Sequence, residues 1–311
     1  MRPSLSVDIA PGRKNSLVLK NPVMPASGCF SWGLEFARHF DVGALGAVVS
    51  KGVTMAPRQG NPQPRVAETP AGMLNSIGLQ NIGIDACISD MAPVWARWDV
   101  PVIVNVAGDT VEEFGEMARM LDGVPGIAGI ELNISCPNVD MGGIEIGQDV
   151  GASARATRAA VRNTDLPVIV KITPNVTDPV SLARACEAEG AAAICAINTV
   201  LGLAIDVDRR RAVLPRARGG LSGPAIKPIA LRIVYDIARA VSVPVIGCGG
   251  VSSGQDAVEF LMAGATAVQV GTATFANPRA LLDVVEGLEA WMTARHITDV
   301  NDLIGASFRD A

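Results

Sequence analysis

Histidine, charge and long apolar runs are all scarce in this sequence of 311 residues. Only two histidines occur, His39 and His296, which argues against zinc or di-metal chemistry, so we expect no metal site. Charged residues make up 18% and apolar residues 49%, a balance that argues against disorder and allows a large core. The net charge is −5 and no basic run occurs, so we expect no nucleic-acid partner.

The six cysteines include no C-x-x-C pair, which argues against an iron–sulfur cluster bound by this chain alone. Residues 1–16 carry several charges and lack the apolar centre of a secretory signal. The longest uncharged stretch, residues 260–278, is broken by glycines and by polar residues, whereas a membrane helix needs about 20 mostly apolar residues. We therefore expect a reduced, cytoplasmic protein that does not span a membrane.

Short apolar runs alternate with longer amphipathic segments along the chain. The short runs predict strands over residues 22–26, 44–50, 101–106, 129–134, 167–172, 191–198, 244–248 and 267–270. The amphipathic segments predict helices, for example over residues 110–121, 150–162, 179–189, 227–240, 254–263 and 278–291. Strands that alternate with helices form parallel sheets, and eight such units close into a (β/α)8 TIM barrel. We expect one such α/β domain over residues 1–311, with an N-terminal hairpin.

A doubly wound open sheet is the competing architecture. No G-x-G-x-x-G motif follows the first predicted strand, which weakens that alternative. Two insertions, residues 55–81 and 201–224, follow predicted barrel strands; the first is rich in proline and glycine, and the second resembles a hairpin. Because barrel enzymes carry their active sites at the carboxyl ends of the strands, we expect both insertions at the catalytic face.

Amides, two lysines and glycine turns end the predicted strands, and carboxylates are nearly absent there. These residues are Ser27, Lys51, Asn105, Asn133, Lys171, Asn198, Gly249, Gly250, Gly271 and Thr272. The set suits a planar neutral or anionic ligand that carries a phosphate, and it does not suit glycoside hydrolysis, which needs two carboxylates. Glycines before a helix allow backbone N–H groups to approach a phosphate, although tight strand–helix turns would also explain them.

Lys51, Lys171 and Cys136 each have two interpretations. A lysine at a strand end either extends its amine to solvent or faces an anion in the barrel mouth. A free cysteine is usually a small buried apolar residue. We give that interpretation to Cys87, Cys186 and Cys195. Cys136 instead precedes a loop with several glycines, which is compatible with catalysis, and no nearby histidine supports a protease-like pair.

Six longer motifs resemble one enzyme family. They are SKGVT (50–54), MLNSIGLQN (73–81), NISCPNV (133–139), INT (197–199), GGLSGPAIKP (219–228) and VGT (270–272). Together they resemble the catalytic subunit of class 1B dihydroorotate dehydrogenases over nearly the whole chain. The resemblance implies a flavoprotein oxidoreductase that converts (S)-dihydroorotate to orotate in pyrimidine (UMP) biosynthesis.

The resemblance also implies roles for individual residues. FMN would be bound by Ser27, Lys51, Gly52, Asn105, Asn133, Lys171, Ile197, Gly223, Gly249, Gly250, Gly271 and Thr272. Dihydroorotate would be contacted by Lys51, Asn75, Ser76, Ile77, Gly78, Leu79, Asn133, Asn138, Asn198 and Thr199. Cys136 would be the general base while a hydride passes to FMN. Electrons would reach NAD through a second subunit that carries FAD and a [2Fe-2S] cluster, in a heterotetramer of two chains of each kind.

Three alternatives stay open on the sequence. A class 1A dihydroorotate dehydrogenase, a homodimer that reduces fumarate, shares the Cys136 motif. Dihydropyrimidine dehydrogenases have a similar flavin domain, but they carry additional iron–sulfur domains. A non-catalytic phosphate-binding barrel that serves as a scaffold would keep the glycine turns and would bind no flavin.

Overall fold

A computed structural model gives the fold and describes residues 2–12, 14–134 and 146–309. Its largest sheet has eight parallel strands in the order β3-β16-β15-β10-β9-β8-β7-β4. Their bounds are β3 (Val23–Pro25), β4 (Val48–Val49), β7 (Val102–Val106), β8 (Gly129–Asn133), β9 (Val168–Ile172), β10 (Ala193–Ala196), β15 (Val245–Cys248) and β16 (Ala267–Val270). The first and last strands of this order meet where Gly46 N donates to Val23 O at 2.9 Å, so the sheet is nearly closed.

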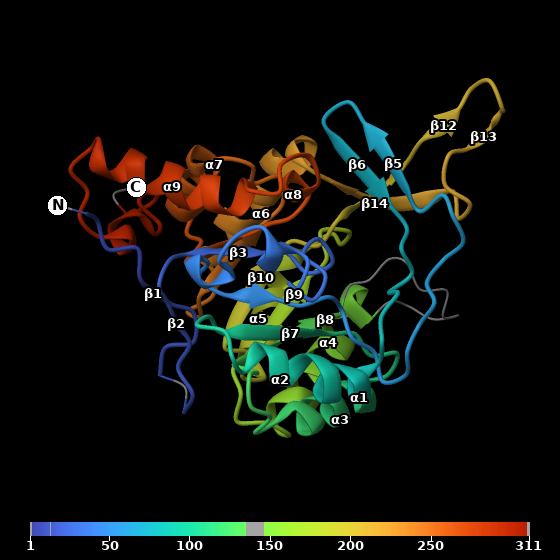
Figure 1. Cartoon of the computed structure of the whole chain (residues 1–311), viewed down its shortest axis with the longest axis horizontal. Coiled ribbons are helices and arrows are strands. Elements are labelled where there is room, and N and C mark those ends of the chain that lie inside the picture. The colour runs from blue at the N-terminus through green and yellow to red at the C-terminus, as the bar shows by residue number, and fades with distance from the viewer. Residues whose placement is uncertain (1, 13, 135–145, 310–311) are drawn as a thin grey trace.

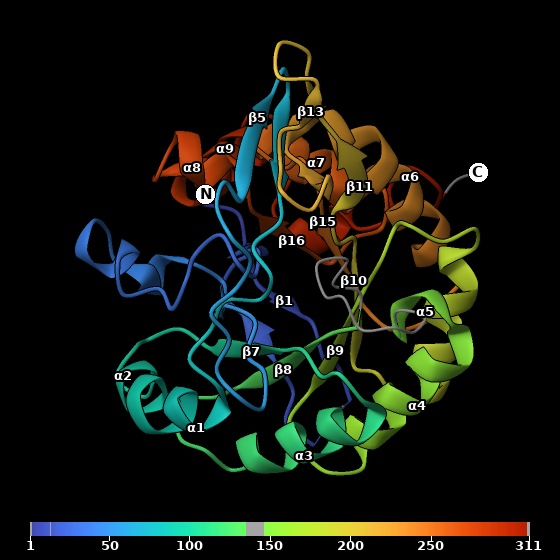
Figure 2. The same cartoon turned by 90° about the vertical axis from the view of Figure 1, so that its right-hand side faces the viewer.

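Helices fill the connections between the barrel strands and form a ring around them (Figure 2). They are α1 (Ile84–Ala86), a π-helical turn (Cys87–Met91), α2 (Ala92–Trp95), α3 (Val111–Leu121), α4 (Val150–Val161), α5 (Pro179–Ala188), α6 (Lys227–Ala238), α7 (Gly254–Met262), α8 (Ala273–Ala276) and α9 (Ala280–Thr293). Short 3-10 turns cover Phe36–Arg38, Val42–Ala44, Ile146–Gln148, Pro224–Ile226 and Val300–Leu303. The predicted (β/α)8 barrel is confirmed.

The predicted elements differ from the observed ones mainly at their ends. The predicted strand over 44–50 is reduced to β4, because a 3-10 turn occupies Val42–Ala44. Capping side chains fix the starts of α3, α4, α5 and α7. Before α3, for example, the Thr110 hydroxyl accepts from Glu113 N at 3.2 Å. No helix within the described ranges is long and apolar enough to cross a membrane.

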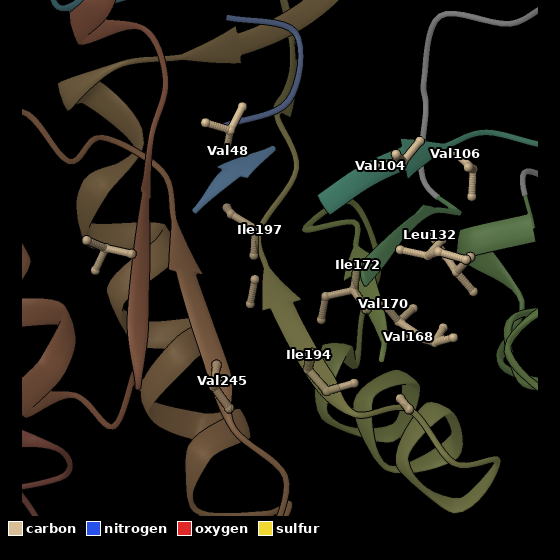
Figure 3. Packing of buried hydrophobic residues seen from close by; sticks show 14 of the residues in the cluster. Val48, Val104, Val106, Leu132, Val168, Val170, Ile172, Ile194, Ile197 and Val245 are labelled. Atoms are coloured by element: carbon tan, nitrogen blue, oxygen red, sulfur yellow. The ribbon is translucent and has the colours of Figure 1, made fainter. Parts of the chain in front are cut away.

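Alternate residues of each barrel strand face two different cores. Outward residues such as Val104, Leu132 and Val170 pack against the helices, and several of them are drawn in Figure 3. Inward residues such as Ile103 and Ile169 fill the part of the barrel interior that lies toward the amino-terminal ends of the strands. The strands are buried on both faces, which explains why the sequence shows nearly continuous apolar runs there.

The N-terminal hairpin closes the amino-terminal end of the barrel. It consists of β1 (Val7–Asp8) and β2 (Val18–Leu19), which pair antiparallel. Leu17 and Leu19 are buried in the same cluster as the inward strand residues, and a Cβ on Gly129 would lie 3.4 Å from Leu17 Cδ2. The hairpin itself was expected from the sequence; the structure adds that it covers the end of the barrel opposite the predicted catalytic face.

The two insertions pair with each other in a second, antiparallel sheet. Its order is β11-β14-β6-β5, from β11 (Val200–Leu203), β14 (Arg218–Ser222), β6 (Gly72–Asn75) and β5 (Val66–Thr69). A further hairpin, β12 (Ile205–Asp206) and β13 (Arg211–Ala212), extends from it. Figure 1 shows these strands projecting from the barrel, away from both termini. The catalytic-face position of both insertions is confirmed, whereas their mutual pairing was not expected from the sequence.

Candidate active site

A cavity of about 390 Å³ opens at the carboxyl ends of the barrel strands. Its wall comes from the turns after β3, β4, β10, β15 and β16 and from the ends of β8 and β9. The antiparallel sheet of the insertions adds residues such as Met73 and Asn75 from β6. Residues far apart in the sequence meet here because parallel strands all end at the same edge of the barrel.

Most of the predicted site residues line this cavity. From the predicted cofactor set these are Ser27, Lys51, Gly52, Asn133, Lys171, Ile197, Gly223, Gly249, Gly250, Gly271 and Thr272. From the predicted substrate set they are Lys51, Asn75, Ile77, Leu79, Asn133, Asn198 and Thr199. The structure thus brings together residues that were selected only by strand ends and motifs.

Five predicted residues are not part of this lining. One of them, Asn105, is fully buried beneath the cavity and belongs to the polar network described below. Ser76 is buried and its hydroxyl accepts from Asn61 Nδ2 at 3.1 Å, so it holds the loop rather than facing the cavity. Gly78 has a φ of +73° and contacts Asn61 closely, so it also shapes the loop. Cys136 and Asn138 lie outside the described residues.

The charged side chains that line the cavity in the described part of the chain are all basic. Lys51, Arg65 and Lys171 line it, and no carboxylate does among the residues that the structure describes. Four primary amides also line it, from Asn75, Gln80, Asn133 and Asn198. Each primary amide offers both a donor and an acceptor, so the cavity suits an anionic ligand with amide-like edges. Within the described ranges no group of three or more histidine, cysteine or carboxylate side chains could hold a metal ion.

Hydrogen bonds fix how two of these amides are oriented. Asn198 Nδ2 donates to Asn133 Oδ1 at 3.1 Å, which directs the Asn133 Nδ2 group away from that contact. Asn75 Nδ2 donates to Gly220 O of β14 at 3.2 Å. This second bond anchors the cavity wall to the pairing between the two insertions, which explains why the antiparallel sheet matters for the site.

A layer of buried polar side chains lies beneath the cavity, inside the barrel. Asn105 Nδ2 donates to Glu131 Oε1 at 2.7 Å, and Gln269 Nε2 donates to Glu131 Oε2 at 2.5 Å. Lys171 Nζ donates to Gln269 Oε1 at 2.7 Å and lies 3.8 Å from Glu131 Oε1. These four residues come from four strands and form one connected network in the barrel interior.

The charge of Lys171 is stabilised within this network. Burial alone would lower the pKa of its amine, but the acidic groups of Cys248 and Glu131 outweigh burial and raise the pKa. The amine is therefore a permanent cation in the cavity floor. A buried cation next to a ligand strongly favours negative charge on that ligand, because the surroundings screen it weakly.

A buried acceptor next to the cavity, Asn105 Oδ1, has no partner among the described residues. Asn105 Oδ1 is fully buried and accepts no hydrogen bond within the described part of the chain. It points toward Gly52, where a Cβ would lie only 2.9 Å from it, and Gly52 lines the cavity. Because an unpaired buried acceptor costs free energy, its position indicates that a ligand donor reaches it.

Glycine turns form a narrow cradle at one end of the cavity. Gly250 has a φ of +79°, and a Cβ on it would lie 2.8 Å from Lys227 Cβ and 2.9 Å from Gly223 O. Gly223 has a φ of +97° and approaches the backbone of Gly72. Only glycine allows this backbone conformation together with such close packing, and backbone N–H groups in such turns can approach a phosphate.

The adjoining helix start is already occupied by a side chain of the protein. Asp256 accepts from Ser252 N and Ser252 Oγ, both at 2.9 Å, and from Lys227 Nζ at 2.6 Å. Ser253 caps α7 through Asp256 N. The sequence suggested that a phosphate would lie at this helix start, whereas the geometry places the Asp256 carboxylate there. The glycine turns therefore remain as the candidate phosphate cradle.

The described cysteines fall into two groups. Cys87 and Cys186 are buried among apolar side chains, and burial raises the pKa of their thiols to about 12 and about 11. Cys195 is buried too, so the expectation for these three residues is confirmed. Cys29 and Cys248 line the cavity instead, and a hydrogen bond with Cys195 together with the charge of Lys171 lowers the pKa of Cys248.

Sequence reasoning missed several polar residues of this region, among them Glu131, Gln269, Arg65 and Gln80. Glu131 and Gln269 lie inside otherwise apolar strands, in the segments GIELN and AVQV. A usable signal existed: a charged or amide residue on the inward face of a strand that is buried on both faces. Arg65, from the first insertion, was also missed and adds a cation to the cavity wall.

Comparisons with known proteins agree with this geometry. The sequence model of the family described as dihydroorotate dehydrogenase matches residues 14–292. A protein of Trichlorobacter lovleyi is 53% identical over 306 residues, which is 98% of this chain and 99% of that protein. Proteins of Citrifermentans bemidjiense (52% over 305 residues, 98% of each chain) and Desulforudis audaxviator (51% over 293 residues, 94% and 95%) are similarly close. All three are named dihydroorotate dehydrogenase B (NAD(+)), catalytic subunit.

Proposed function

The chain belongs to the dihydroorotate dehydrogenase family, and from this premise we propose what its cavity does. The protein is a dihydroorotate dehydrogenase that oxidises dihydroorotate to orotate, a step of pyrimidine biosynthesis, and its electrons pass to NAD. The observation that carries this proposal is the 53% identity, over 98% of the chain, with a catalytic subunit of that name. The cavity agrees with it, since orotate is a planar anion with amide edges and the wall offers cations and amides.

We propose FMN as the group in the barrel mouth. The residues fit this group on three counts: the unpaired Asn105 Oδ1 can accept from a ring N–H, the glycine cradle can receive a phosphate, and Lys171 favours negative charge on the ring. When bound, FMN supplies the acceptor for the hydride that leaves the substrate. The holding residues would be Ser27, Lys51, Gly52, Asn105, Asn133, Lys171, Ile197, Gly223, Gly249, Gly250, Gly271 and Thr272.

The substrate side of the cavity is assigned to its amides and to Lys51. Lys51 would face the substrate carboxylate, since an ammonium group pairs well with such a point charge. Asn75, Asn133 and Asn198 would hydrogen-bond the amide edges of the ring. Ile77, Leu79 and Thr199 of the cavity wall, together with Asn138, would complete the substrate contacts. These contacts bind and orient the ring so that the carbon that loses a hydride faces the cofactor.

Cys136 is our candidate for the general base. It follows β8 by three residues, and β8 ends at the cavity with Asn133. The thiolate would take the proton from C5 of dihydroorotate while the hydride leaves C6, so one C=C bond forms and two hydrogens depart. A thiol with the ordinary cysteine pKa of about 8.5 supplies enough thiolate for this role in mildly alkaline solution.

Electrons must then leave this subunit, and we propose a second protein for that step. The relatives are named catalytic subunits of an NAD(+)-dependent enzyme, which implies a partner chain. We propose that the partner carries FAD and a [2Fe-2S] cluster, that two chains of each kind form a heterotetramer, and that the assembly is cytoplasmic. The fumarate-reducing class 1A homodimer and the non-catalytic scaffold are not favoured by these names.

The acceptor used by the purified chain tests this function. We expect the isolated chain to be yellow, to contain about one FMN, and to reduce dyes with dihydroorotate but NAD only slowly. Addition of the partner subunit should restore NAD reduction. Full NAD reduction by the chain alone would rule out the partner, efficient fumarate reduction by a homodimer would favour class 1A, and a colourless inactive protein would favour the scaffold.

A further inference from the structure

Glu131 is a buried carboxylate that no part of the mechanism above uses. Its side chain has no exposed surface, and it does not line the cavity. Both of its oxygens accept hydrogen bonds, one from Asn105 and one from Gln269. A buried carboxylate is costly unless it is paired and hydrogen-bonded, so its place at the centre of the barrel calls for an explanation.

The first consequence of Glu131 concerns the orientation of Asn105. An ionised carboxylate can only accept, so the Asn105 Nδ2 group must face Glu131. The Asn105 Oδ1 atom is thereby turned toward Gly52 and the cavity, where it has no partner among the described residues. Without Glu131 the amide could rotate by half a turn and present a donor to the ligand instead.

The second consequence concerns charge. Gln269 links the two charged groups, because its Nε2 donates to Glu131 and its Oε1 accepts from Lys171. Lys171 lines the cavity and Glu131 lies behind it, 3.8 Å away. The carboxylate therefore partly cancels the field that Lys171 exerts on the ligand, and in a weakly screened interior such cancellation is substantial.

We propose that Glu131 is a positioning residue that acts through Asn105 and Lys171. Through Asn105 it fixes an acceptor for a ring N–H of FMN, and through Lys171 it moderates how strongly the site favours the reduced, more negative ring. This proposal rests on the proposed function, because it takes FMN as the ligand. The Glu131 carboxylate thereby controls both the affinity for FMN and the reduction potential of bound FMN.

Two variants separate these effects. Glu131→Gln keeps the shape and removes the charge, so we expect the ratio of reduced to oxidised FMN at a fixed potential to rise about tenfold, which for two electrons is about 30 mV. Glu131→Asp keeps the charge and withdraws the carboxylate by one methylene from Asn105. For that variant we expect FMN to bind about tenfold more weakly while its potential stays near the wild-type value.

The measurements are made on the whole chain with FMN itself. Apoprotein is titrated with FMN by fluorescence, and the potential of the loaded protein is read against a reference dye. Glu189→Gln is the matched control, since Glu189 pairs with Arg158 on the outside of the molecule, and it should change neither value. A purely structural role for Glu131 would lower thermal stability and leave the potential unchanged.

The outcomes distinguish this inference from the function on which it rests. If wild-type apoprotein binds no FMN, the proposed function fails. If it binds FMN but Glu131→Gln has the potential of the control, or a lower one, the charge argument is overturned. If Glu131→Gln fails to fold, the test uses Glu131→Asp, which keeps a carboxylate near Lys171. Unchanged FMN affinity of the Glu131→Asp variant would then overturn the proposal.

Discussion

The two faces of the barrel strands build cores of opposite character, although they alternate residue by residue. On the outer face, Val104 and Val170 pack into an apolar layer beneath the helices (Figure 3). On the inner face, Ile103 and Ile169 give way, two residues further along their strands, to Asn105 and Lys171. A shift of one residue along a strand thus separates a position that stabilises the fold from one that shapes the ligand site.

This difference indicates that stability and ligand binding can be changed independently. Outer-face substitutions should lower the free energy of unfolding and leave FMN binding intact in the folded fraction. Substitutions of inward residues near the carboxyl ends of the strands, and of residues in the turns that follow, should weaken FMN binding and leave the free energy of unfolding nearly unchanged.

Gly250→Val should abolish FMN retention and with it all turnover. The added Cβ would meet Lys227 Cβ at 2.8 Å and Gly223 O at 2.9 Å, and a branched side chain is strained at a φ of +79°. Flavin absorbance per mole of purified protein is the measurement. Gly123→Val is the matched control, because Gly123 has a φ of +69° but open space around it. Full FMN occupancy in the Gly250 variant would mean that the phosphate binds elsewhere.

Cys136→Ser should keep FMN bound and lower turnover at neutral pH by about a thousandfold, within the usual range for loss of a general base. A serine hydroxyl is a far weaker acid than a thiol, so little of it is deprotonated near pH 7. Residual activity should therefore rise as the pH increases. Steady-state rates across a pH series, normalised to bound FMN, give the comparison. Wild-type turnover of the variant at pH 7 would exclude Cys136 as the base.

The outer core and the architecture could be predicted from the sequence because they depend on local patterns. Eight apolar runs and the helical segments between them predicted the barrel. Residues at predicted strand ends and in the family motifs form most of the cavity wall. The inner polar network could not be predicted in the same way. The bond from Gln269 to Glu131 joins residues 138 positions apart, and it exists only once the barrel has closed in this register.

The remaining differences have the same physical origin. Ser76 and Gly78 belong to a motif that reaches the cavity. However, Asn61 donates a hydrogen bond to the Ser76 hydroxyl and packs against Gly78, so both residues stabilise the loop instead. The start of α7 has the glycines expected of a phosphate site, but its own Asp256 satisfies the nearby donors. In each case a tertiary partner, which the local pattern does not reveal, determined the role of the residue.

Phe114→Ala should destabilise the protein by about 3–5 kcal/mol and leave FMN binding by the folded protein unchanged. Phe114 has no exposed surface and lies on α3, in the layer between helices and sheet. Its removal leaves a cavity in that layer, away from the ligand. Chemical unfolding followed by circular dichroism measures the loss, and Ile229→Ala, at an exposed residue of α6, should change little. Loss of FMN affinity in folded Phe114→Ala would contradict the independence of the two cores.

The smallest effect is expected for an ion pair on the outside of the molecule. Arg158 of α4 donates to Glu189, and their side chains are 47% and 20% exposed, whereas Lys171 and Glu131 are 6% and 0% exposed. Water screens the outer pair, so its attraction is largely offset by the lost side-chain freedom. Arg158→Met should therefore leave the melting temperature and the FMN potential unchanged within error, at low and at high salt. A clear loss of stability at low salt that disappears at high salt would show that the helix layer also depends on charge, and the contrast between the two faces would then be one of degree.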